Sequence, residues 1–288
     1  MQGGATLQFA GIPMNLMRRG RAGYIVTGNF ANKAYKEAAK YGEAVLLASS
    51  EDTNFDRIPD MADINARIAA EAAGDGLDYV YICQNNTIFG TMYRELPNCG
   101  DVPLVADVSS CFLSQPLDVE RYGLIYAGAQ KKRRAAGVTV VIVRDDLIAD
   151  GPAFAQTPQY MNLKTQAAKG SMLNTPNTFG IYVCGKVFRW VEQTGGLAAM
   201  AERNWAKATC STTCSSTASC SMAPRRPTAA PSPTSRSVPA TPNSTRPLLR
   251  ARQSTRSKTS RAIASSAECA PACTTPSPWR TCRRWPRT

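Results

Sequence analysis

The sequence contains no histidine, and this absence removes several kinds of chemistry. Catalytic triads and dyads that use an imidazole base are excluded, and so are metal sites built on histidine ligands. The chain also lacks an uninterrupted apolar run of about 18 residues, the length needed to span a membrane, and no charged and apolar leader opens it. We therefore expect a protein that neither crosses a membrane nor is secreted.

Glycine is missing from residues 209–288, although 20 glycines precede them. Charge divides at the same point, because these last residues hold twelve arginines and Lys258 against the single acid Glu268, whereas residues 1–208 are nearly neutral. Cysteine divides there too, with six of ten in the last segment. The other four lack the spacing of a disulfide framework, which favours a reducing, cytoplasmic location.

Residues 209–288 show neither a helical nor a strand period, and Ser, Thr, Pro, Ala, Arg and Cys dominate them. Two interpretations stay open: a disordered basic tail, or a segment translated in the wrong frame from a GC-rich gene. The Cys210/Cys214/Cys220 and Cys269/Cys273 spacings are loose and no histidine completes them, so we expect no metal site.

Residues 1–208 alternate between helical and strand patterns, which predicts an α/β domain. A helix that begins at Leu7 is expected to stop at Pro13. The segment 137–143 is the strongest strand, and its β-branched composition predicts burial on both faces. The remaining expected helices are 32–42, 61–73, 177–194 and 196–208, and the remaining expected strands are 43–48, 79–83, 102–106 and 122–127.

Two residues at strand ends suggest a specific chemistry. Lys131 follows the apolar run 122–127 and a small-residue turn, and Asp107 ends the run 102–106. Carboxyl ends of neighbouring strands meet at one edge of an α/β sheet, where ligands bind. A lysine there can form an imine with a carbonyl cofactor, and a carboxylate can pair with a protonated ring nitrogen, as in pyridoxal-phosphate enzymes. Individually, a surface lysine and a turn aspartate are the simpler interpretations.

Three further motifs could serve the same edge. The turn Gln2-Gly3-Gly4-Ala5-Thr6 precedes an expected helix start, a combination that can bind phosphate, although taken alone a plain turn is the simpler interpretation. Thr87 could bring a hydroxyl to the edge or could sit in an ordinary polar turn. Phe30 is either a stacking surface for a flat ring or a core aromatic.

Together these motifs resemble phosphoserine aminotransferase, a family of fold-type I pyridoxal-phosphate enzymes. The resemblance implies the large domain of that fold, a mixed, mainly parallel sheet with helices on both faces, over residues 1–208. It covers most of residues 2–208, through stretches that stand in family order: QGGATLQF, TGNFANKAYKEAAKYG, ASSEDTNFDRIP, QNNTIFGTMY, GDVPLVADVSS, YGLIYAGAQK, AGVTVVIVRDDL and LNTPNTFGIYVCGKVFRWVEQTGGLAAMAERN.

The resemblance implies a role for each matching residue. Lys131 would be the Schiff-base lysine and proton shuttle, and Asp107 would keep the pyridine nitrogen protonated. Asn174 and Thr175 would reach the cofactor phosphate of a neighbouring subunit, which implies a homodimer with shared sites. The other cofactor contacts would be Gly4, Ala5, Thr6 and Gln130 at the phosphate, Thr87 at the phenolic oxygen, Phe30 at the ring face and Ser109 beside Asp107.

The implied activity is transamination of O-phosphoserine with 2-oxoglutarate, giving 3-phosphohydroxypyruvate and glutamate, a step of serine biosynthesis. The cofactor would be pyridoxal 5′-phosphate, and no membrane or nucleic-acid partner is expected. Another small-molecule aminotransferase of the same fold is an open alternative. So is an inactive remnant, or an α/β binding module whose basic tail contacts nucleic acid.

The chain departs from the family pattern in three places. The family has a further segment before QGGA and a small domain, with an arginine that binds the substrate carboxylate, after Ala208. Residues 132–136, one lysine and two arginines followed by two alanines, place surplus positive charge beside Lys131 where the family has an uncharged turn. A short compensated frame slip there and a lasting one after Ala208 would explain the pattern. We therefore expect cofactor binding to be weak or absent and turnover to be low.

Overall fold

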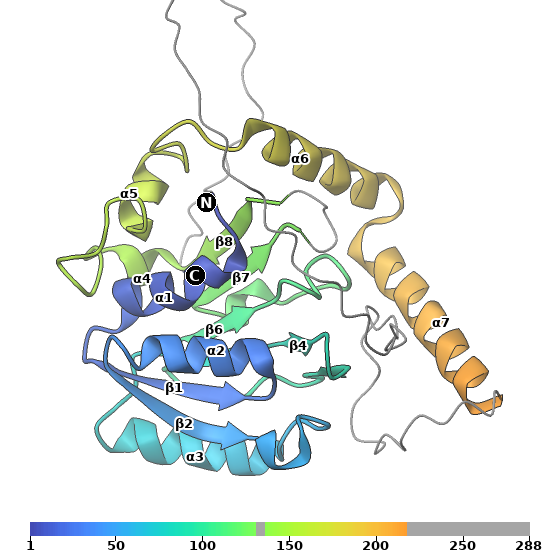
Figure 1. Cartoon of the computed structure of the whole chain (residues 1–288), viewed down its shortest axis with the longest axis horizontal. Helices are drawn as coiled ribbons and strands as arrows, with labels where there is room; N and C mark the ends of the chain where they lie inside the picture. The colour runs from blue at the N-terminus through green and yellow to red at the C-terminus, as the bar shows by residue number, and fades with distance from the viewer. Residues whose placement is uncertain (131–135, 218–288) are drawn as a thin grey trace, which may run out of the picture. The chain divides into compact units, whose positions relative to one another are not determined.

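The computed structural model describes residues 1–130 and 136–217, in which helices and strands alternate along the chain (Figure 1). The main sheet has six strands in the order β2-β1-β3-β6-β7-β8. They are β1 (Arg21–Val26), β2 (Glu43–Ser49), β3 (Val80–Cys83), β6 (Leu104–Asp107), β7 (Leu124–Gly128) and β8 (Thr139–Val143), and a separate hairpin joins β4 (Asn85–Asn86) to β5 (Thr91–Met92).

Seven α-helices and three 3-10 turns surround these strands within the described residues. The helices are α1 (Gln8–Leu16), α2 (Asn29–Ala38), α3 (Met61–Ala73), α4 (Asp145–Ile148), α5 (Leu163–Ala168), α6 (Thr178–Gln193) and α7 (Gly196–Thr217). The 3-10 turns are η1 (Ala5–Leu7), η2 (Glu51–Thr53) and η3 (Val119–Arg121). No helix among the described residues is both long enough and apolar enough to cross a membrane.

The sheet is parallel from β2 to β7, and only β8 runs antiparallel. Strand order reverses beside β1, because β2 lies on one side of it and β3 on the other. In open α/β sheets a crevice forms outside the carboxyl ends of the two strands at such a reversal, and ligands bind there. The topology thus directs attention to the ends of β1 and β3.

Helices cover both faces of the sheet. The helices α1 and α2 pack on one face, while α3 lies on the other (Figure 1). On the first face, Phe9, Ile12 and Leu16 of α1 meet a row of buried tyrosines on the strands. On the second face, Ile64 and Ile68 of α3 meet aliphatic residues of β1 and β3. The expected architecture, a mixed and mainly parallel sheet between helical layers, is confirmed.

Most expected elements are confirmed within a few residues of their predicted ends. The helix α3 has the predicted limits, because Asp60 caps it by accepting the Ala62 N–H at 2.8 Å. The helix α2 begins at Asn29, earlier than predicted, directly behind the end of β1. The helix α7 continues past Ala208 to Thr217, so it crosses the predicted boundary of the tail.

Two expectations about helices and strands are wrong, and the strand β1 was not predicted from the sequence. The helix α1 continues through Pro13 to Leu16, because its apolar face, with Ile12 and Leu16, is fully buried and offsets the lost hydrogen bond. The strand β8 is not buried on both faces: it lies at the edge of the sheet, and Ile142 is 37% exposed.

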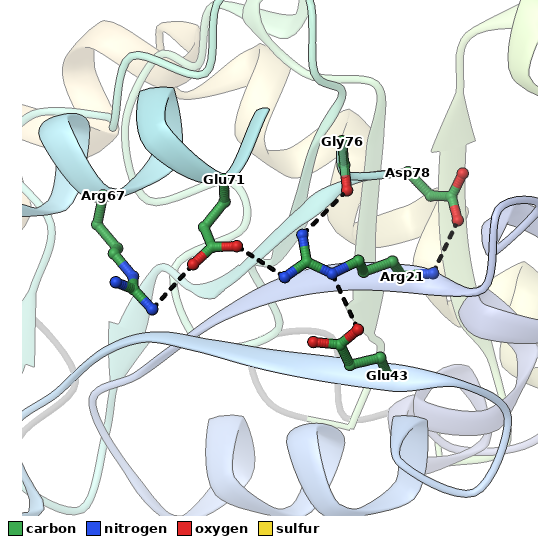
Figure 2. Close-up of polar contacts among 6 residues, drawn as sticks. All are labelled: Arg21, Glu43, Arg67, Glu71, Gly76 and Asp78. Atoms are coloured by element: carbon green, nitrogen blue, oxygen red, sulfur yellow. Dashed lines mark hydrogen bonds and ion pairs between the residues drawn. The ribbon is translucent and has the colours of Figure 1, made fainter. Parts of the chain in front are cut away.

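The amino ends of the first strands are tied together by Arg21, as Figure 2 shows. Its guanidinium binds Glu43 of β2 at 2.9 Å, Glu71 of α3 at 2.7 Å and the Gly76 carbonyl at 3.4 Å. Glu71 also binds Arg67 at 2.8 Å, and Asp78 accepts the Arg21 backbone N–H at 3.2 Å. These contacts join β1 to β2 and to α3 at the amino edge of the sheet, opposite the edge where the carboxyl ends of the strands lie.

Candidate active site

Asp107 is the last residue of β6 and its side chain is almost fully buried, at 5% exposure. The strand register places it between Cys83 of β3 and Tyr126 of β7. Its Oδ1 accepts the Ser109 N–H at 2.8 Å, which is the local contact of a turn aspartate. The turn interpretation and the functional one are therefore compatible, since the turn holds a buried carboxylate at the carboxyl edge.

Ser109 connects this carboxylate to the end of β7. While its backbone N–H donates to Asp107, its Oγ accepts the Gly128 N–H at 2.9 Å. A side chain at Gly128 would place its Cβ 2.6 Å from the Gln130 Oε1 and 3.1 Å from the Ala5 Cβ, so a glycine is needed there. The end of β7 is thereby held close to Asp107, and it leads directly into Lys131.

Lys131 itself lies outside the described residues, as do Lys132 to Ala135. Its neighbours on both sides are placed. Gln130 is exposed and its side chain folds back over Gly128. Beyond the gap, the Ala136 carbonyl accepts a hydrogen bond from the Asn177 Nδ2 at 2.9 Å. Both ends of the segment that contains Lys131 are thus fixed at the carboxyl edge of the sheet.

The turn that opens the chain lies beside the end of β7. The Gly3 N–H donates to the Gly137 carbonyl at 3.2 Å, and the Thr139 hydroxyl donates to the Gly3 carbonyl at 3.1 Å. After Gly4, η1 leads into α1, with Ala5 buried and Thr6 exposed. The first N–H groups of a helix have no partners within it, which makes its start suited to a phosphate.

Thr87 and Phe30 come to the same edge from β3 and β1. Thr87 is half-buried at the turn between β4 and β5, the hairpin that directly follows β3. Phe30, in the first turn of α2, is 36% exposed, and Lys33 Nζ lies 5.8 Å from its ring centroid. The core interpretation of Phe30 is therefore wrong, because Ala31, Ala34 and Ala38 form the buried face of α2.

Asn174 and Thr175 are exposed and contact the opening turn of the same chain. The Gln2 Nε2 donates to the Asn174 Oδ1 at 3.2 Å and to the Thr175 carbonyl at 2.6 Å. Asn177 then caps α6 by accepting the Gly180 N–H at 2.9 Å. The segment before α6 is therefore fixed beside the phosphate-type turn, with the Asn174 and Thr175 side chains at the surface.

Beneath Asp107 lies a pair of buried tyrosines. The hydroxyls of Tyr81 and Tyr126 are 2.7 Å apart, and both side chains lie on the face of the sheet that carries Asp107. Burial raises the pKa of each phenol well above its ordinary value, and the negative charge of Asp107 raises it further. The floor of the site is thus made of neutral hydroxyls, with Asp107 as a carboxylate above it.

Sequence reasoning missed two residues of this edge, Asn86 and Thr139. Both are nearly fully buried, at 4% and 1% exposure, and both hold parts of the site through side-chain hydrogen bonds. Asn86 reaches Thr27 and Thr139 reaches Gly3, partners that are far away in the sequence, so spacing gives no signal for these contacts. All predicted site residues that the structure describes come to one edge, from the opening turn, from the ends of β1, β3, β6 and β7 and from the segment before α6.

Comparison with known proteins assigns this arrangement to a family. The model of the family "Aminotransferase class-V" matches residues 3–234. The chain belongs to the class-V aminotransferases. Among curated members of this family, the phosphoserine aminotransferase of Lysinibacillus sphaericus is 46% identical over 209 residues, which cover 72% of this chain and 55% of that protein. This class-V chain therefore spans about half the length of the curated relatives it matches.

Solved structures of class-V aminotransferases give the same result. The phosphoserine aminotransferase of Bacillus circulans subsp. alkalophilus is 40% identical, with a TM-score of 0.69 over 74% of this chain and 57% of that one. A phosphoserine aminotransferase from Trichomonas vaginalis, described as bound to pyridoxal phosphate, is 33% identical, with a TM-score of 0.65 over 73% of this chain and 57% of that one. The resemblance found in the sequence is confirmed.

Proposed function

We propose that this chain binds pyridoxal 5′-phosphate through Lys131 and serves the transamination of O-phosphoserine with 2-oxoglutarate, giving 3-phosphohydroxypyruvate and glutamate. The observation that carries this proposal is the placement of Asp107. A buried carboxylate at the carboxyl edge is joined by Ser109 to the strand end that leads into Lys131. The similarity to phosphoserine aminotransferases supports the choice of substrate.

The residues present suit this cofactor. The Asp107 carboxyl group at this edge can pair with a protonated pyridine nitrogen. The turn Gly4-Ala5-Thr6 at the start of η1 and α1 suits the phosphate, with Gln130 beside it. Thr87 offers a hydroxyl for the phenolic oxygen, and the exposed ring of Phe30 offers a stacking surface.

When bound, pyridoxal phosphate supplies an electron sink for the negative charge that develops on the α-carbon of the amino acid. Asp107 holds a proton on the ring nitrogen, which makes the ring a better sink. Lys131 Nζ would hold the cofactor through its carbonyl group, and as a free amine it would carry the proton to and from the α-carbon. Ser109 holds Asp107 next to the end of β7, which leads into Lys131, so that the two residues can act on the same cofactor.

We further propose that the protein acts as a homodimer, in which Asn174 and Thr175 contact the cofactor of the partner. Beside them, α6 exposes three large side chains on one face: Phe179 at 75%, Tyr182 at 60% and Trp190 at 50%. A solvent-exposed apolar surface of this kind is typical of an interface. Light scattering should give a dimer, and Tyr182→Glu should weaken it, whereas Val119→Glu, at another exposed apolar residue, should not.

Spectroscopy and mass spectrometry of the purified chain test the cofactor proposal. Wild-type protein mixed with pyridoxal phosphate is expected to show a visible absorption band, and borohydride reduction should leave the adduct on Lys131. Lys131→Ala should lose both signals. The control Lys40→Ala changes a surface lysine paired with Glu37 and should keep both. An adduct on another lysine, or none in the wild type, would contradict the proposal.

A panel of amino donors tests the substrate. With 2-oxoglutarate as acceptor, O-phosphoserine should form glutamate faster than serine, aspartate or alanine does. Preference for an unphosphorylated donor would favour another aminotransferase specificity while leaving the cofactor assignment intact. The cysteine pattern favours a reducing compartment, so we place the protein in the cytoplasm.

A further inference from the structure

A single buried side chain, that of Asn86, bridges the two strands at the reversal point of the sheet. Its Nδ2 donates to the Thr27 Oγ1 and to the Thr91 Oγ1, both at 3.1 Å. Thr27 directly follows β1 and is fully buried, while Asn86 belongs to the hairpin that follows β3. Asn86 therefore lies at the carboxyl ends of β1 and β3, the place where open α/β sheets bind ligands.

The Asn86 Oδ1 packs against Gly28, the residue that precedes α2. A Cβ at Gly28 would lie 2.7 Å from the Asn86 Oδ1, closer than real Cβ contacts allow. Gly28 caps α2, and its carbonyl accepts the Asn32 N–H at 3.0 Å. Since Gly28 has an extended backbone that any residue can adopt, the glycine serves this close approach. Phe30 follows two residues later, so Asn86 packs against the residue from which the helix of Phe30 starts.

The backbone of Asn86 organises the turn that carries Thr87. Its carbonyl accepts the Phe89 N–H at 3.2 Å and the Gly90 N–H at 2.8 Å, and Gly90 completes the turn with a φ of +72°. The Phe89 ring packs against Phe55 with centroids 4.9 Å apart. Thr87 is thus held on a braced turn, which Asn85 joins to Ser110 and which the Asn86 side chain joins to Thr27.

We propose that Asn86 is a positioning residue for the cofactor. It fixes the hairpin of Thr87 against the helix start of Phe30, so that hydroxyl and ring meet the cofactor in one arrangement. This inference rests on the proposed cofactor binding, and it adds a residue to which the resemblance gave no role. Asn86 itself does not need to touch the cofactor, because its hydrogen bonds are made to Thr27 and Thr91.

A double-mutant cycle between Asn86 and Gly28 tests the proposal. Asn86→Ala removes the bridge, and we expect about tenfold weaker binding of pyridoxal phosphate, as expected when hydrogen bonds of this kind are lost. Gly28→Ala alone should weaken binding similarly, because its methyl group displaces the Asn86 side chain. In the double variant the methyl group has space, so the two effects should not add. The visible circular dichroism of the bound cofactor should change in both single variants.

Milder variants and a matched control protect this test against simple loss of folding. Thr27→Val and Thr91→Val each remove one hydroxyl partner with little change in size, and each should weaken binding about threefold. Tyr122→Phe removes another buried hydrogen bond next to the hairpin, from the Tyr122 hydroxyl to Gln84 at 3.0 Å. It should lower the melting temperature without changing cofactor affinity or dichroism.

The outcomes separate the inference from the proposed function. A wild-type chain without the visible band would overturn the proposed function, and the inference with it. A wild-type chain with the band, but with additive effects of Asn86→Ala and Gly28→Ala, would overturn the inference alone. Equal loss of affinity in Tyr122→Phe would also overturn it, because a general decrease in stability would then explain the result.

Discussion

The two edges of the central sheet hold their polar groups in different ways. At the carboxyl edge, Asp107 and Asn86 are buried, and their hydrogen bonds go mostly to amides and hydroxyls. At the amino edge, Arg21 forms charged pairs with Glu43 and Glu71, which leave part of their surface in solvent. The strands are shared by both edges, so the contrast arises from the residues that stand at each end.

This difference suggests that the carboxyl edge contributes to cofactor binding and the amino edge to the stability of the fold. Opposite charges at the amino edge neutralise one another, and hydrogen bonds to Glu43 and Glu71 raise the pKa of Arg21 further above its ordinary value. At the carboxyl edge, Asp107 lies near tyrosines that burial keeps neutral, and it is the residue proposed to pair with a cationic ring nitrogen. Matched substitutions at the two edges should therefore change different observables.

The largest difference is expected from a pair of isosteric changes. Asp107→Asn keeps the acceptor for the Ser109 N–H but removes the charge, and should cost about 2 kcal/mol of cofactor binding, or about thirtyfold in affinity. Asp78→Asn is its counterpart at the amino edge, where the carboxylate accepts backbone N–H groups of Arg19 and Arg21. It should lower the melting temperature and leave affinity unchanged. Titration of pyridoxal phosphate and thermal melts measure both, and equal affinities of the two variants would contradict the contrast.

The link between β6 and β7 gives a smaller effect. Ser109→Ala leaves the Gly128 N–H without its acceptor and should cost about 1 kcal/mol of stability, together with a several-fold loss of cofactor affinity. Ser109→Thr retains the hydroxyl and should recover most of the affinity. Denaturant unfolding and cofactor titration provide the two readouts. Failure of Ser109→Thr to recover affinity would indicate that the size of residue 109 matters more than its hydroxyl.

Local sequence signals predicted the elements whose ends depend on neighbouring residues. The helix α3 matched because Asp60 supplies the cap and Gly74 follows its last turn. The strand β8 was misjudged because its composition indicates burial, whereas its place at the sheet edge depends on distant strands. The start of α2 was placed too late because the helix begins only two residues after β1, with Gly28 as the residue before it.

The same limit applies to the site. Asp107 could be predicted because it ends an apolar strand, and the parallel sheet then places it at the ligand-binding edge. Asn86 could not be predicted, because its role depends on its contacts with Thr27 and Gly28. These residues come next to Asn86 only after β1 and β3 have paired. Sequence patterns thus identify functional side chains that stand at strand ends, and they miss the side chains that hold those strand ends together.

At the amino edge, Arg21→Met should affect stability alone. The change keeps the length of the side chain but removes its pairs with Glu43 and Glu71, leaving Glu71 with Arg67 (Figure 2). We expect a melting temperature lower by a few degrees and an unchanged affinity for pyridoxal phosphate. The control Lys40→Met removes an exposed pair with Glu37 and should change neither quantity measurably. A loss of cofactor affinity in Arg21→Met would show that the two edges are coupled.

The smallest effect is expected at Cys99, which lines two hollows of about 550 and 630 Å³ on either side of the loop 98–103. Burial raises the pKa of this thiol to about 12, against a weaker opposite effect of Arg121. Because only the thiolate reacts, alkylation by iodoacetamide at pH 8 should be at least about a hundredfold slower in the folded protein than in denaturant. Peptide mapping over time measures both rates. Rapid labelling of the folded chain would mean that this edge holds a reactive group, and it would remove the distinction between a binding edge and a structural one.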